Sequence, residues 1–130
     1  MVLILLSLQV MNDIKTLIES AGDDRELAVD LLELFKEQAI EGIAALSDAV
    51  QKEDSKEAVH LAHKLVGSAI ACGFIDLSQE LRFIETECQR EVPDDIEQRL
   101  QTVSQLLERG CNEMGRVLAD EKLYEKGAYN

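Results

Sequence analysis

The two histidines of the chain, His60 and His63, lie three residues apart in the segment HLAHKLVGSAIACG, which covers residues 60–73. A neutral imidazole can attack phosphorus, and the phosphoramidate that forms is labile enough to pass its phosphoryl group onward. An H-x-x-H pair can also bind a metal ion, but such sites need three or four ligands, and the nearest carboxylates, Glu53 and Glu57, precede the segment. The pattern therefore favours phosphoryl transfer, and we expect no metal site.

Helical periodicity divides this segment into two faces. One face is apolar and is expected to be buried, and it consists of Ala58, Leu61, Ala62, Leu65, Ala69 and Cys72. The opposite face consists of His60, His63, Gly67, Ile70, Ala71 and Phe74. A solvent-facing surface is usually polar, so small and apolar residues around two imidazoles indicate a surface kept open for a partner.

Gly67 distinguishes the two histidines. A glycine inside a helix costs about 1 kcal/mol relative to alanine, so its presence on the exposed face needs a reason. Helical side chains lean toward the N-terminus, and a side chain at position 67 would therefore cover His63. The same geometry places Lys64 over His60, and so His63 is selected as the accessible imidazole.

The charge distribution predicts a docking surface around His63. Residues 58–75 contain no acid and one lysine, in a chain whose formal charge is −13, so an incoming anion meets less repulsion here. Phe74 either joins this surface or folds inward at the helix end. The residues expected to contact a partner protein are Val59, Gly67, Ile70, Ala71 and Phe74.

These residues must be positioned by helices, because few stretches of the chain alternate as strands do. Asp23 or Asp24 is expected to cap a long helix, and Asp76 to cap a later one. The expected helices cover about residues 12–20, from the Asp23–Asp24 cap to about 52, 55–73, from 76 to the EVPDD turn that contains Pro93, and from about 95 onward. The predicted fold is all-α, an antiparallel four-helix bundle with a short additional N-terminal helix.

Composition limits the classes of partner. With 130 residues the chain fits one domain, and its strongly acidic charge argues against nucleic acid and anionic membrane surfaces. The three cysteines form no C-x-x-C pair and fall at apolar helical positions, so we expect reduced, buried thiols and a cytoplasmic protein. No serine-histidine-aspartate set, glycine-rich phosphate loop or paired-carboxylate cleft accompanies the histidines, so a partner must supply the remaining catalytic groups.

The ends of the chain differ from its middle. Residues 1–10, MVLILLSLQV, form an apolar extension that lacks the basic start of a signal peptide and is too short to span a bilayer. Residues 11–120 carry the helical bundle, and residues 121–130 form a polar C-terminal tail. We expect a monomer, with residues 1–10 as a candidate self-association segment.

The histidine helix resembles the histidine-containing phosphotransfer (HPt) family. The matching residues are Ala62, His63, Gly67, Ser68 and Gly73, and the resemblance, which includes GDDRELAVDLLELFKEQA, covers about residues 12–118. It implies a four-helix bundle in which His63 accepts a phosphoryl group from a receiver-domain aspartate and passes it to another receiver domain, in a multistep two-component phosphorelay. The receiver brings the aspartate and Mg²⁺, so the resemblance implies no cofactor on this chain and no stand-alone enzyme.

One position departs from the family pattern. The family carries a lysine three residues after the histidine, where it is thought to pair with the phosphoryl oxygens, and this chain has Val66. His60 and Lys64 are the neighbours expected to compensate, and Gly67 and Ser68 complete the expected phosphate neighbourhood. Two alternatives stay open: a degenerate bundle that binds receivers without phosphotransfer, and a helical metal-binding or dimerisation module.

Overall fold

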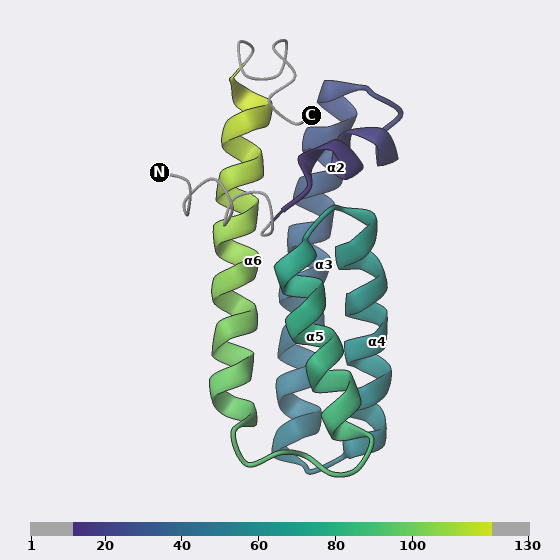
Figure 1. Ribbon diagram of the computed structural model, residues 1–130, viewed down its shortest axis with the longest axis vertical. Helices are drawn as coiled ribbons and strands as arrows, with labels where there is room; N and C mark the ends of the chain where they lie inside the picture. The colour runs from purple at the N-terminus through teal and green to yellow at the C-terminus, as the bar shows by residue number, and fades with distance from the viewer. Residues whose placement is uncertain (1–11, 121–130) are drawn as a thin grey trace.

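The computed structural model describes residues 12–120, and in this part of the chain it contains helices and no strand. The helices are α2 (Ile14–Ser20), α3 (Arg25–Gln51), α4 (Ser55–Ala71), α5 (Ile75–Cys88) and α6 (Ile96–Ala119). The four long helices run alternately up and down, and α2 lies across one end of the bundle (Figure 1). The predicted all-α, antiparallel four-helix bundle with a short additional N-terminal helix is confirmed. Residues 1–10 and the tail at 121–130 lie outside the described residues.

Aspartates begin three of these helices. Asp13, Asp24 and Asp54 each accept a hydrogen bond from a backbone N–H in the first turn of the helix that follows. The prediction that Asp76 caps α5 is wrong, because the N-cap residue is Phe74 and makes no side-chain capping hydrogen bond. Asp76 lies in the first turn instead and accepts a hydrogen bond from the N–H of Leu77.

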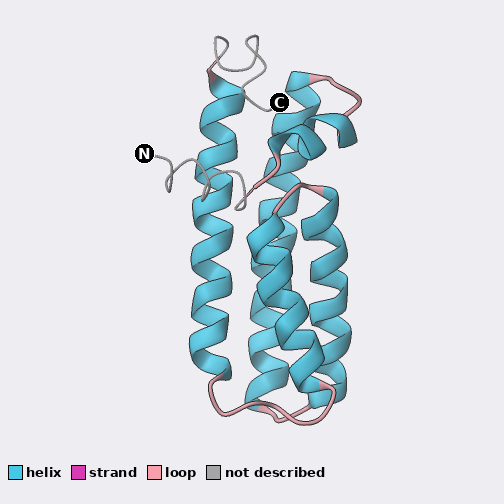
Figure 2. Ribbon diagram, in the orientation of Figure 1, coloured by secondary structure: helices cyan, strands magenta, loops and turns pink. Residues whose placement is uncertain are grey.

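The turn between α4 and α5 is fixed by a glycine. Gly73 adopts a φ of +81°, which a residue without a side chain reaches at no steric cost. Its carbonyl accepts a hydrogen bond of 2.7 Å from the N–H of Asp13, and a Cβ atom at position 73 would overlap the Asp13 carbonyl oxygen. The start of the described chain is therefore fastened to the α4–α5 turn, and α5 is brought directly against α4 (Figure 2).

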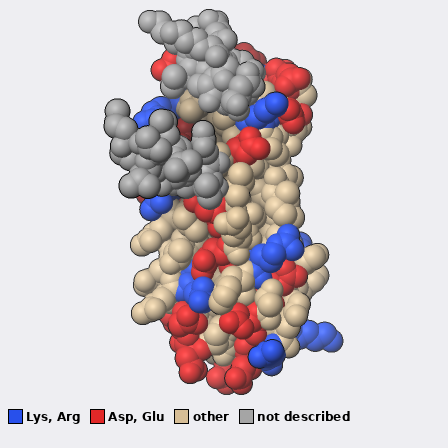
Figure 3. Space-filling view, viewed as in Figure 1, with Lys and Arg blue, Asp and Glu red and all other residues tan. Residues whose placement is uncertain are grey.

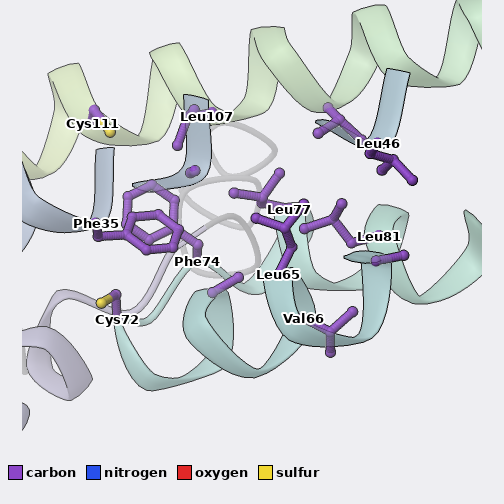
Figure 4. Close-up of a cluster of buried hydrophobic side chains, with 14 of the residues drawn as sticks. Phe35, Leu46, Leu65, Val66, Cys72, Phe74, Leu77, Leu81, Leu107 and Cys111 are labelled. Carbon is purple, nitrogen blue, oxygen red and sulfur yellow. The ribbon is translucent and has the colours of Figure 1, made fainter. Parts of the chain in front are cut away.

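The core occupies the space between the four long helices (Figure 4). Phe74 is 0% exposed and packs on Phe35, with their ring centroids 4.6 Å apart. Of the two positions open to Phe74 in the sequence, the structure selects the inward one, so the prediction that it docks a partner is wrong. Burial removes apolar surface from water, and a large ring at a helix junction gains most from facing the interior.

The three cysteines are free and buried, as predicted. Burial raises the pKa of the Cys72 thiol to about 11, and it also raises the pKa of Cys88 and Cys111. All three are therefore uncharged at neutral pH and act as small core side chains.

Arg99 fastens α6 to α5 on the side away from α4. Its guanidinium lies 3.7 Å from the centre of the Phe83 ring and pairs with Glu80 at 3.0 Å and with Asp95 at 3.1 Å. This cluster holds α5 between α4 and α6 and fixes the α5 face that is turned toward the histidine helix.

Candidate functional site

His63 lies at the middle of α4 with its imidazole in solvent. The side chain is 74% exposed, and its Nδ1 lies 2.7 Å from Oε2 of Glu85 on α5. A carboxylate accepts hydrogen bonds and donates none, so this contact places the ring proton on Nδ1. In the neutral ring, Nε2 therefore keeps its lone pair for an incoming electrophile.

Glu85 is the residue of the site that the sequence did not indicate. It stands 22 positions after His63 on a different helix, and its side chain is 15% exposed, between the two helices. No motif along one helix could reveal it. Helical spacing places Glu85 on the same side of α5 as the buried Ser78. This spacing indicates a role for Glu85 only once it is known that this side of α5 faces α4.

Gly67 leaves the space beside His63 open. A Cβ atom placed on this exposed glycine would have no atom of another residue within 4 Å, apart from the helix backbone beside it. The glycine is therefore not needed for close helix packing, in contrast to Gly110, where a Cβ atom would lie 2.6 Å from the Phe74 ring. Close helix packing therefore does not account for glycine at position 67.

Replacing Gly67 by alanine is expected to stabilise the fold and impair phosphoryl acceptance. The free energy of unfolding should rise by up to about 1 kcal/mol, because alanine is the better helix former and meets no clash. An added Cβ would not touch His63, but it would occupy surface that the partner approaches, so the rate at which His63 accepts phosphate should fall. The longer side chain of Gly67→Leu should lower this rate further. Urea unfolding and labelling kinetics measure the two effects.

Gly115→Ala on α6 is the matched control, because its Cβ would lie 3.9 Å from the nearest atom, a Leu32 methyl carbon, which is an ordinary contact. This variant should gain stability and keep the labelling rate. Equal labelling rates for wild type, Gly67→Ala and Gly67→Leu would contradict the role assigned to the gap.

The other predicted phosphate neighbours are distributed over two sides of α4. His60, Lys64 and Ser68 are all exposed. Lys64 and Ser68, however, line a groove between α3 and α4 together with Gln38 and Glu41 of α3. Lys64 is therefore turned toward α3, whereas Glu85 holds His63 toward α5.

Val66 does not belong to the phosphate neighbourhood. It is 3% exposed, and Figure 4 shows it among the buried side chains of the core. Since α5 covers this side of α4, the position three residues after His63 faces the interior in this chain. The sequence-based placement of Val66 beside the phosphoryl group is wrong.

The predicted docking surface is only partly exposed. Gly67, Ile70 and Ala71 lie at the surface, and Ile70 is 50% exposed. Val59 is partly buried against the core, so it offers less surface than expected. Within residues 12–120, no group of three or more histidine, cysteine, aspartate or glutamate side chains is placed to hold a metal ion.

Comparison with known proteins identifies the family of the chain. The Hpt domain family matches residues 30–120. The chain belongs to the Hpt family. The match includes α4, α5 and α6 together with most of α3, and hence both His63 and Glu85.

A solved structure supports the fold of this Hpt domain. The chain is similar to the HPT domain of the Hpt sensor hybrid histidine kinase from Shewanella, with 18% identity and a TM-score of 0.62. The alignment covers 83% of this chain and 93% of that one. A comparison with curated proteins finds no match.

None of the helices in the described part of the chain is both long and apolar enough to cross a membrane. Membership in the Hpt family supports a histidine phosphotransfer role in a phosphorelay.

Proposed function

We infer that this Hpt domain is a phosphorelay intermediate that accepts a phosphoryl group on His63 from a receiver-domain aspartate and passes it to another receiver domain. The exposed imidazole, with Nδ1 held by Glu85 at 2.7 Å and Nε2 free, is the observation that carries this proposal. A relay site needs access for two partners in turn, and a ring on an open helix face provides it.

The tautomer determines the chemistry at His63. The Nε2 lone pair attacks phosphorus, a P–N bond forms, and the bond from phosphorus to the aspartyl oxygen breaks to release the carboxylate. The ring already carries a proton on Nδ1, so it becomes positively charged once Nε2 is substituted. Glu85 then faces a cation, and its hydrogen bond from Nδ1–H becomes an ion pair. Transfer to the next receiver reverses these steps, and no proton has to leave the site.

The receiver supplies what the chain lacks. We propose that Mg²⁺ and the phosphorylated aspartate come with the receiver domain, and that the Hpt domain contributes a positioned nucleophile and not a complete active site. Ile70 and Ala71, on the helix that carries His63, are the apolar contacts proposed for that partner. A monomer in the cytoplasm suits this exchange between soluble partners.

Label transfer tests the proposal directly. The full chain is incubated with a receiver domain phosphorylated on its aspartate with ³²P, and a second, unlabelled receiver is then added. The expected result is an acid-labile, base-stable label on the chain that moves to the second receiver. A chain that binds the receiver but never acquires label would instead support the degenerate bundle.

The degenerate bundle makes a separate prediction about binding. Complex formation with a receiver would survive His63→Ala in either case, but only the relay proposal requires that wild type carries the label. Metal titration of wild type and His60→Ala, and sedimentation of the chain with and without residues 1–10, address the metal-binding and dimerisation alternatives.

Glu85→Ala is expected to slow phosphoryl acceptance by roughly three- to tenfold, the factor that loss of one partly exposed charge-assisted hydrogen bond predicts. Without the carboxylate the ring populates both tautomers and turns more freely. Glu85→Gln should retain more of the rate, since an amide oxygen still accepts from Nδ1–H. Single-turnover labelling measures both variants. The control is Glu87→Ala on the same helix, and an equal loss in that variant would contradict a specific role for Glu85.

A further inference from the structure

Since position 66 is a valine, a phosphoryl group on His63 lacks the cation that the family motif would supply from α4. A phosphoryl group on a histidine carries negative charge and strong acceptor oxygens. In water-exposed sites such a group is best held by a guanidinium or ammonium within hydrogen-bond reach. A cation that binds this group must therefore come from another position on the surface around His63.

Four cations lie on α4, on α5 or directly after α5, and all four are exposed. Lys64 is turned into the α3–α4 groove. Lys56 lies seven residues before His63, a distance of about 10 Å along the helix. Arg90 lies beyond Cys88, the last residue of α5. Arg82 is the one that remains.

Arg82 lies one turn from Glu85 on α5. Residues 78, 82 and 85 are separated by four and three positions, so they share one side of the helix. Ser78 is buried and Glu85 reaches His63, which shows that this side faces α4. Arg82 is exposed, so it occupies the solvent edge of that side.

The antiparallel arrangement places Arg82 beside the open part of α4. Moving from Glu85 to Arg82 runs toward the start of α5, and because the two helices are antiparallel it runs toward the end of α4 (Figure 1). Along α4 this is the direction from His63 to Gly67. Packed helices are about 8–10 Å apart, a separation that an arginine side chain bridges. An Arg82 side chain that crossed to α4 at this level would meet the apolar Val66, and the gap at Gly67 would leave room for its guanidinium.

The charges nearby leave Arg82 available. No ion pair or side-chain hydrogen bond engages its guanidinium within residues 12–120, whereas Arg99 on the other side of α5 is held by two carboxylates. Figure 3 shows basic side chains over α4 and α5 with acidic ones beside them, and the densest group of acidic side chains at the lower end of the bundle. Glu85, the nearby acid, is already engaged with His63.

We propose that Arg82 binds the phosphoryl group on His63 and so takes the place of the lysine that the family motif carries at the position of Val66. This inference rests on the proposed function of His63. The phosphate-binding cation of this chain then comes from α5. The same helix holds the His63 imidazole through Glu85 and the phosphoryl group through Arg82.

The test uses phosphoramidate, a small phosphoryl donor, so that no partner influences the result. Nε2 of His63 attacks its phosphorus, a P–N bond to the ring forms, and the P–N bond to the donor breaks with release of ammonia. ³¹P NMR of the full chain then reports the lifetime of phosphohistidine and the pKa of its phosphoryl group. Wild type is compared with Arg82→Gln, Arg82→Lys and Lys64→Gln.

Arg82→Gln should shorten the phosphohistidine lifetime by about three- to tenfold. It should also raise the pKa of the phosphoryl group, because a nearby cation favours the dianion. Arg82→Lys should restore most of both properties, and Lys64→Gln should match wild type. Far-UV circular dichroism confirms that the variants keep the helical fold.

The experiment distinguishes a failure of the Arg82 proposal from a failure of the proposed function of His63. If wild type forms phosphohistidine on His63 and Arg82→Gln shows an unchanged lifetime and phosphoryl pKa, the role of Arg82 is overturned and the function of His63 stands. If His63→Gln acquires as much phosphohistidine signal as wild type, the proposed function itself is overturned, and the Arg82 proposal falls with it.

Discussion

His63→Gln is expected to abolish labelling of the chain by a phosphorylated receiver. Glutamine has an amide nitrogen whose lone pair is delocalised, so it cannot attack phosphorus, yet it is polar and suits an exposed helix position. His63 is 74% exposed and contributes no core packing, so the variant should unfold at the same urea concentration as wild type. Loss of label with stability unchanged would assign the effect to chemistry and not to folding.

His60→Gln is the matched control for that experiment. It removes the other imidazole of the chain, also exposed and one turn earlier on α4. His60 lies under the stem of Lys64 in the helical register, and no carboxylate holds it among the described residues. This variant should retain most of the label. If His60→Gln lost the label and His63→Gln kept it, the phosphoacceptor would have been assigned to the wrong histidine.

Phe74→Ala is expected to cost about 3–5 kcal/mol of unfolding free energy, the usual range for truncating a buried aromatic ring. The ring fills the junction between α4 and α5, packs on Phe35 and lies against Gly110 of α6. Small domains are stable by only about 5–15 kcal/mol, so this single change should remove a large part of the total. Urea unfolding followed by circular dichroism measures the loss.

Phe83→Ala provides a comparison at an aromatic residue of the same helix. Phe83 is partly solvated and stacks under Arg99, so its truncation leaves no closed cavity. We expect a loss of about 1 kcal/mol, from the stacking contact and the half-covered ring. Similar losses for the two phenylalanines would show that Phe74 does not anchor the junction.

The helices and the exposure of His63 could be predicted from the sequence, because both depend on local patterns. Apolar residues at helical spacing define the bundle and place His63 on its solvent side. The expected shielding of His60 by Lys64 is not seen, because His60 is exposed as well. The free, buried cysteines follow from the same periodicity, since each occupies an apolar helical position.

Properties that depend on packing between helices could not be predicted in the same way. Glu85 reaches His63 only because α5 turns one particular side toward α4, and that rotation follows from how the core closes. Val66 was misplaced for the same reason: a residue three positions after an exposed one can face either water or a neighbouring helix. The sequence pattern leaves open whether Phe74 faces outward or inward, and the turn at Gly73 places it at the start of α5, where it faces inward.

The hydrogen bond between Asp13 and Gly73 has a consequence for where the folding unit begins. The family match starts at residue 30, inside α3, yet α2 contributes the buried Leu17 and Ile18, and the residue that caps it holds the turn from which α5 starts. A protein trimmed to residues 30–120 would lose the cap of α3 at Asp24 and expose the apolar surface that α2 covers. The folding unit is therefore longer than the stretch matched by the family, and it includes the residues from Asn12 onward.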